Sequence, residues 1–252
     1  MKLPCYLAEL SYPQAEALRA QSPVVLIPVG ATEAHGPHLA LGTDSFLSDE
    51  LARRSQRALD ERGVASLIAP PLCYSVTEFG AGFAGTVSID AATAKALYVA
   101  VFLGLSRAGF SRLCLVNNHL EPAHIATLHA AVAEVEQRAG LRVAFPDQTE
   151  RRWARTLTEE YRRGNCHAGR YETSLLLATQ PQLVDEAEQR ALRQNDADFL
   201  QAVRQGSGDF ASAGGPRAYF GDPAAATQAE GDDTYGRLVA MVLAVIGELW
   251  PG

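Results

Sequence analysis

The chain of 252 residues is poor in the features that mark nucleic-acid-binding and membrane proteins. Lysine and arginine number 22 against 29 aspartates and glutamates, so no basic surface for nucleic acid or an anionic membrane is expected. The longest apolar run, ALYVAVFLGL, is too short to span a bilayer. The first residues also lack the apolar core of a signal peptide. We therefore expect a cytoplasmic protein without nucleic-acid or membrane partners.

Cysteine is scarce as well. The four cysteines have no Cys-x-x-Cys spacing, so neither a disulfide scaffold nor a zinc ribbon is indicated. Internal repeats and low-complexity tracts are missing too. The chain is rich in apolar residues, at 47%, which is enough to bury a sizeable core. Its length fits one large α/β domain covering residues 1–252.

Strands and helices alternate along the predicted structure. Aliphatic runs predict buried strands at 23–30, 64–70, 112–118 and 141–146. Capping residues and apolar spacing predict helices over about 44–62, 90–107, 122–138, 149–163, 171–180 and 233–250. Residues 205–231, rich in Gly, Ala, Ser and Asp, are predicted as an extended surface loop. This order favours a single three-layer αβα domain with a mostly parallel central sheet.

Two motifs of acidic residues and histidines, GATEAHGPHLALGTDS and NNHLEP, directly follow the first and third predicted strands. Because the carboxyl ends of parallel strands lie at one edge of a sheet, the motifs should meet there. They mirror each other, as Glu33-x-His35 and His119-x-Glu121, and residues two apart in an extended backbone point the same way. Asp44, at the start of the following helix, offers a third carboxylate.

A third motif, CHAGRYETS, adds His167 and Glu172. Mixed imidazole and carboxylate ligands suit Zn²⁺, Mn²⁺ or Fe²⁺. The number of carboxylates exceeds the needs of one zinc ion and matches two divalent ions about 3.5–4 Å apart that share one carboxylate. Such a centre would activate a water molecule and polarise a carbonyl group. His38 is expected to hydrogen-bond within its loop, and Cys166, beside His167, to have a structural role.

Two other functions are compatible with parts of this pattern. His119, Glu121 and His167 imitate the two-histidine, one-carboxylate triad of a mononuclear iron oxygenase. That interpretation leaves Glu33, His35 and Asp44 without a role. The other alternative is a catalytically inactive metal-binding scaffold. Counting the bound metal and measuring turnover would distinguish the three.

At these residues the sequence resembles the creatininase (creatinine amidohydrolase) family. The matching stretches are VGATEAHGPHLALGTD, GFAGTVSID, VNNHLEP and HAGRYETS, in the family's order. The resemblance implies an αβα fold, two divalent metal ions per chain, with Zn²⁺ favoured over Mn²⁺ or Fe²⁺, and a homo-oligomer, with a hexamer favoured. It also implies hydrolysis of a C–N bond in a small cyclic or linear amide. A creatinine-like lactam, a hydantoin-like ring, a formamide and a short peptide all remain open as substrates.

The resemblance also implies a role for each residue. Asp44 would bridge the two ions, and His167 and Glu172 would serve in catalysis, with His167 as the proton carrier. The ligands of one ion would be Glu33 and His119, with Glu172 near it, and those of the other His35 and Glu121. Residues expected near the substrate are Thr86 in FAGT, Trp153 and, in RRGNC, Arg162 or Arg163.

Overall fold

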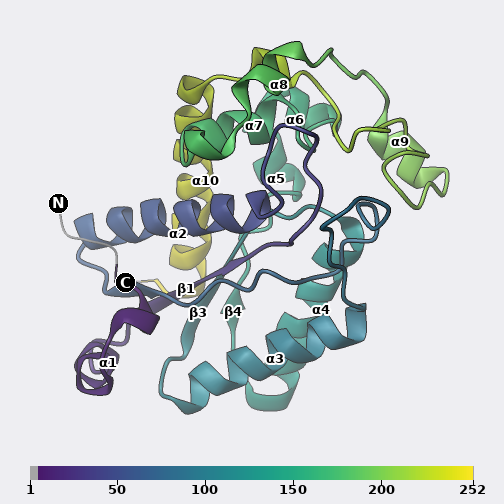
Figure 1. Ribbon diagram of the computed structural model, residues 1–252. Coiled ribbons are helices and arrows are strands. Elements are labelled where there is room, and N and C mark those ends of the chain that lie inside the picture. Colours follow the sequence, from purple (N-terminus) through teal and green to yellow (C-terminus); the bar gives the residue numbers. More distant parts are fainter. Residues whose placement is uncertain (1–4, 252) are drawn as a thin grey trace.

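A four-stranded parallel sheet forms the centre of the protein (Figure 1). The computed structural model describes residues 5–251. The strands lie in the order β2-β1-β3-β4 and comprise β1 (Val24–Val29), β2 (Ser66–Ile68), β3 (Arg112–Asn117) and β4 (Val143–Ala144). The two central strands, β1 and β3, pair over their whole length. The predicted parallel α/β arrangement is therefore confirmed, although the two outer strands are shorter than predicted.

The helices that surround the sheet are mostly those that the sequence predicts. They are α1 (Tyr12–Arg19), α2 (Thr43–Glu61), α3 (Ala91–Arg107), α4 (Pro122–Ala139), α5 (Arg151–Ala154), α6 (Glu159–Arg163), α7 (Arg170–Leu177), α8 (Glu186–Ala191), α9 (Phe199–Arg204) and α10 (Gln228–Leu249). Short 3₁₀ turns occupy Leu7–Glu9, Pro181–Leu183 and Pro223–Ala225.

Each face of the sheet is covered by its own set of helices (Figure 1). In β1, Val24 and Leu26 pack into one apolar core with side chains of α2, α7 and α10. The alternate residues Val25, Ile27 and Val29 pack into a second core with α3 and α4. A strand covered on both faces needs apolar residues at every position, which explains the unbroken apolar run.

The starts of two helices, α3 and α4, follow local signals in the sequence. The Asp90 side chain accepts hydrogen bonds from the backbone N–H groups of Ala92 and Thr93 at the start of α3. Pro122 occupies the first turn of α4. Asp44, predicted near an N-cap, lies instead inside the first turn of α2, with Gly42 at the N-cap position, and its carboxylate makes no capping bond.

Two predicted elements differ from the structure. The helix predicted over 149–163 is interrupted, because Thr158 caps a new helix, α6, after α5 has ended. The predicted surface loop 205–231 is not exposed throughout. Phe210 and Phe220 anchor it in a small apolar cluster that includes Ala34, and α10 begins within it, at Gln228.

Candidate metal centre and active site

The motifs that follow β1 and β3 meet at the carboxyl edge of the sheet, as predicted. Val29 and Asn117, the last residues of the two strands, are partners in the sheet register. The chain continues from these neighbouring points to a common cluster of side chains. The cluster is buried and consists of Glu33, His35, Asp44, His119 and Glu172.

Gly30 brings the first motif close to α2. A Cβ atom at this position would lie 2.6 Å from the backbone nitrogen of Ser45, a distance at which the backbone would have to shift. Glycine therefore lets the chain that leaves β1 pass directly against the first turn of α2. This close approach places Asp44 beside the residues of the first motif.

The first group of potential ligands combines Glu33, Asp44 and His119. The Nδ1 atom of His119 lies 3.1 Å from Oε1 of Glu33 and 3.0 Å from Oδ2 of Asp44. The other oxygen of Glu33 accepts a hydrogen bond from the hydroxyl group of Thr77. One imidazole nitrogen thus faces two carboxylates.

The second group combines His35, Asp44 and Glu172. The Nε2 atom of His35 lies 3.1 Å from Oδ1 of Asp44 and 3.6 Å from Oε2 of Glu172. Oε1 of Glu33 lies 3.9 Å from the same nitrogen. Asp44 is common to the two groups and turns one oxygen toward each imidazole.

Both imidazoles are oriented by backbone carbonyl groups. Nε2 of His119 lies 2.8 Å from the carbonyl oxygen of Val76, and Nδ1 of His35 lies 3.1 Å from that of Glu33. A ring N–H that donates to a carbonyl group fixes the tautomer and leaves a lone pair on the other nitrogen. In each neutral ring that lone pair faces carboxylate oxygens. Such an arrangement requires a positive charge between them, either a proton or a metal ion.

The electrostatics of the cluster agree with this requirement. Burial alone would lower the pKa of His35, but the carboxylates of Asp44, Glu172 and Glu33 raise it to about 10. Burial opposes ionisation of Asp44 too, yet the neighbouring His35 and His119 hold its pKa below the ordinary range. Its Oδ2 atom is buried and accepts no hydrogen bond. The donor set and this buried oxygen without a hydrogen bond fit divalent cations.

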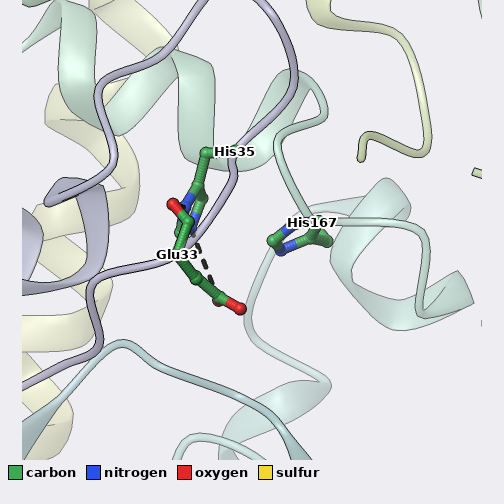
Figure 2. Close-up of side chains that lie close together, drawn as sticks. All are labelled: Glu33, His35 and His167. Atoms are coloured by element: carbon green, nitrogen blue, oxygen red, sulfur yellow. Dashed lines mark hydrogen bonds and ion pairs between the residues drawn. The ribbon is translucent and has the colours of Figure 1, made fainter. Parts of the chain in front are cut away.

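His167 lies beside the cluster (Figure 2). Its Nε2 atom is 3.1 Å from the carbonyl oxygen of Ala34, and its Nδ1 atom is 3.9 Å from Oε2 of Glu172. The ring stacks on Phe210 with centroids 4.1 Å apart and lies 4.7 Å from the ring of His35. Burial, reinforced by His35, lowers the pKa of His167 to about 3. The ring is therefore neutral at neutral pH.

Glu172 and Glu121 stand in places that differ from those implied by the resemblance. Glu172 lies with His35 and also accepts a hydrogen bond of 2.7 Å from the backbone N–H of Ala168. Burial raises its pKa to about 8. The Glu121 carboxylate accepts hydrogen bonds from the backbone N–H groups of Glu78 and Phe79. Among residues 5–251, Glu121 joins none of the ligand groups whose atoms lie within 4.8 Å of one another.

A cavity of about 580 Å³ opens onto the cluster. Glu33, Asp44, His119, His167 and Glu172 contribute to its lining. Its apolar wall consists of Phe79, Leu120, Ala154, Tyr161, Phe199, Leu200 and Phe210. The site is therefore a pocket whose lining combines several ionisable groups with a largely aromatic surface.

The side chains predicted near the substrate lie outside this lining, except for one of the two arginines. Arg162 lines the cavity, whereas Arg163 pairs with Glu159 and lines a second, smaller cavity. Trp153 packs against the apolar core beneath Arg152. The hydroxyl group of Thr86 accepts a hydrogen bond from the backbone N–H of Ala34 and so supports the loop that carries His35.

Several residues that support the cluster are not apparent from the sequence. The side-chain amide of Asn117 donates a hydrogen bond to the backbone carbonyl group of His119 and accepts one from its backbone N–H. It also accepts a hydrogen bond of 2.9 Å from the ring of His124. The buried ring of His124 lies 4.7 Å from that of His119. The position of Asn117 at the end of a central strand is the one signal that could have found it. His38 bonds to Thr173 of α7 rather than within its own loop.

An αβα protein that gathers two imidazoles and three carboxylates at the carboxyl edge of its sheet has the architecture of a hydrolase with a metal centre. The family model described as creatinine amidohydrolase matches residues 8–246. The chain therefore belongs to the creatininase family, and the relatives named creatinine amidohydrolase and mycofactocin precursor peptide peptidase are both hydrolases of carbon–nitrogen bonds. This assignment confirms the predicted enzyme class.

Two relatives and a solved structure illustrate the similarity. The mycofactocin precursor peptide peptidase of Mycobacterium ulcerans (strain Agy99) is 32% identical over 254 residues, which cover 98% of this chain and 93% of the relative. The creatinine amidohydrolase of Pseudomonas putida is 32% identical over 197 residues, covering 71% and 74% of the two chains. A crystal structure of creatinine amidohydrolase has a TM-score of 0.78 at 24% identity, with 99% of each chain covered, which confirms the fold. No helix within residues 5–251 is long and apolar enough to cross a membrane.

Proposed function

We propose that the protein hydrolyses an amide bond of a short peptide-like substrate at a centre of two divalent metal ions. The observation that carries the proposal is the position of Asp44 between two ligand groups, with one oxygen facing His35 and the other facing His119. A carboxylate shared in this way is typical of paired metal ions.

The residues divide into two sets around Asp44. Glu33 and His119 would hold one ion, and His35 and Glu172 the other, with Asp44 between them. Glu121 would then steady the segment at Glu78 and Phe79, to which it is hydrogen-bonded, and would approach an ion only after releasing those N–H groups. Bound there, the ions would supply an activated water molecule and polarise the substrate carbonyl. Zn²⁺ is favoured by the imidazole and carboxylate donors, with Mn²⁺ or Fe²⁺ as alternatives; related creatininases have been solved in a Mn form and a Zn–Zn form.

His167 is the residue proposed to move the proton. Its Nε2–H is held by the carbonyl group of Ala34, so its Nδ1 carries a lone pair on the side of Glu172. Stacking on Phe210 keeps the ring in this orientation. The neutral imidazole would therefore hold a proton only transiently and deliver it to the leaving amide nitrogen, which is a poor leaving group until protonated.

The size of the cavity supports a linear peptide rather than creatinine. A volume of about 580 Å³ is in the range of about 300–1,000 Å³ that accommodates drug-sized ligands. Creatinine has eight non-hydrogen atoms and would leave much of this space unfilled. A relative that matches nearly the whole chain is named a peptidase of a precursor peptide, which agrees with the larger substrate.

Reconstitution with metal tests this function. The protein is stripped with a chelator, reloaded with Zn²⁺ or Mn²⁺, and assayed on N-acetylated di- and tripeptides and on creatinine. We expect hydrolysis of peptides only after reloading, with creatinine a poorer substrate. Undiminished hydrolysis by the stripped protein would contradict the metal centre. Preference for creatinine would contradict the peptide-like substrate.

A further inference from the structure

We propose that three arginines on the wall of the cavity, Arg151, Arg162 and Arg204, bind a carboxylate of the substrate, so that the enzyme selects acidic peptide-like amides. This inference rests on the proposed function, because it assumes that the cavity at the cluster receives the substrate. It adds a specificity element on residues that have no part in holding a metal ion.

The three arginines come from three separate elements that converge on one cavity. Arg151 begins α5, Arg162 belongs to α6 and Arg204 ends α9. All three line the cavity whose inner surface carries Glu33 and His167. The lining of the cavity therefore includes arginines as well as the carboxylates and imidazoles of the cluster.

These arginines differ from their sequence neighbours in their partners. Arg152, next to Arg151, pairs with Glu150 and Glu248, and Arg163, next to Arg162, pairs with Glu159. Within residues 5–251, no carboxylate lies within 4.0 Å of a guanidinium nitrogen of the three cavity arginines. On α5 and α6, the arginines outside the lining of this cavity are thus paired with carboxylates, whereas the arginines in the lining are not.

Other arginines of residues 5–251, such as Arg107, Arg155 and Arg193, also make no ion pair, so what sets the three apart is their common place in the lining of one cavity. Guanidinium groups remain charged at all relevant pH values and match the two oxygens of a carboxylate with parallel N–H groups. Three arginines in the lining of one pocket therefore favour an anion, and they would also attract it from solution.

The wall of the same cavity indicates what else the ligand contains. Phe79, Phe199 and Phe210 line it, and Phe199 and Phe210 lie 5.9 Å apart. These rings offer an apolar surface between polar groups. A substrate that satisfies the pocket thus combines an amide bond, an apolar or aromatic side chain and a carboxylate.

Binding separates this inference from the proposed hydrolysis. The metal-loaded protein is titrated by calorimetry with N-acetyl-L-phenylalanine and with its primary amide, which lacks the carboxylate. The titration is repeated with Arg162→Gln, with the triple variant Arg151→Gln/Arg162→Gln/Arg204→Gln, and with Arg163→Gln as the matched control. We expect the wild type to prefer the acid. Because these side chains are exposed, each arginine should contribute about threefold and the triple variant should lose about thirtyfold.

The control should keep the preference, since Arg163 faces the second cavity. Equal binding of acid and amide by the wild type would overturn the inference, as would a preference that survives in the triple variant, which would mean that the metal ions alone bind the carboxylate. Substrate panels then distinguish the source of the carboxylate, by comparing free with amidated C-termini and aspartate with asparagine side chains. If no peptide were cleaved, the proposed hydrolysis would fail while the binding result still decided this inference.

Discussion

Replacing Asp44 tests the bridging role, because this side chain belongs both to the group with Glu33 and His119 and to the group with His35 and Glu172. Asp44→Ala removes one of three side chains from each group at once. Loss of groups that merely support a ligand lowers metal affinity by about 10- to 100-fold, so loss of a shared ligand should exceed about 100-fold for both ions. Asp44→Asn keeps the volume but places an amide NH₂ against the lone pair of one imidazole. We expect the alanine variant to lose both ions and the asparagine variant to retain at most one.

The assay is elemental analysis of protein desalted by gel filtration, together with metal titration against a competing chelator. Asp49→Asn is the matched control. Asp49 lies on the same helix, and its carboxylate accepts a hydrogen bond of 2.9 Å from the hydroxyl group of Tyr6, outside the cluster. Circular dichroism checks that each variant is folded. An Asp44→Ala protein that is folded and still carries two ions per chain would refute the bridging role.

The other predictions concern catalysis, stability and assembly. His167→Gln should lower turnover by about 10²–10⁴ while metal content and melting temperature stay near those of the wild type; unchanged turnover would remove His167 from the reaction. Chelation should lower the melting temperature by about 10 °C, because metal at 1,000 times its Kd contributes about 4 kcal/mol and a chain of this size shifts by about 2–4 °C per kcal/mol; calorimetry showing no shift would argue against a metal bound in the folded state. Sedimentation should show a homo-oligomer, with a hexamer favoured, and a monomer at micromolar concentration would contradict this.

The parts of the fold that could be predicted are those whose signals are local. The unbroken apolar run of β1, the Asp90 cap and Pro122 each depend on neighbouring residues, and each is found where the sequence indicates it. Helix α1 was not predicted, although Ser11 and Gln14 form a capping box before it. A short helix with little apolar surface gives only a weak periodic signal.

In the candidate site, too, some features could be predicted from the sequence, whereas others depend on contacts that form only in the folded chain. That Glu33, His35 and His119 converge follows from the parallel order of β1 and β3, which the alternation of elements indicates. The partner of His35 could not be predicted, since it depends on the rotamers of Glu172 and Glu121. Glu121 is turned toward the backbone of Glu78 by hydrogen bonds that arise only in the folded chain. The place of Phe210 against His167 depends in the same way on tertiary packing within a segment whose composition indicates an exposed loop.

The central claim is a centre of two metal ions that hydrolyses an amide bond, and the most direct test is a titration of the metal-free protein with Zn²⁺ or Mn²⁺ in which bound metal and peptide hydrolysis are followed together. We expect activity to rise until two ions are bound per chain and then to remain constant. Full activity at one ion per chain, or in the absence of metal, would contradict the claim.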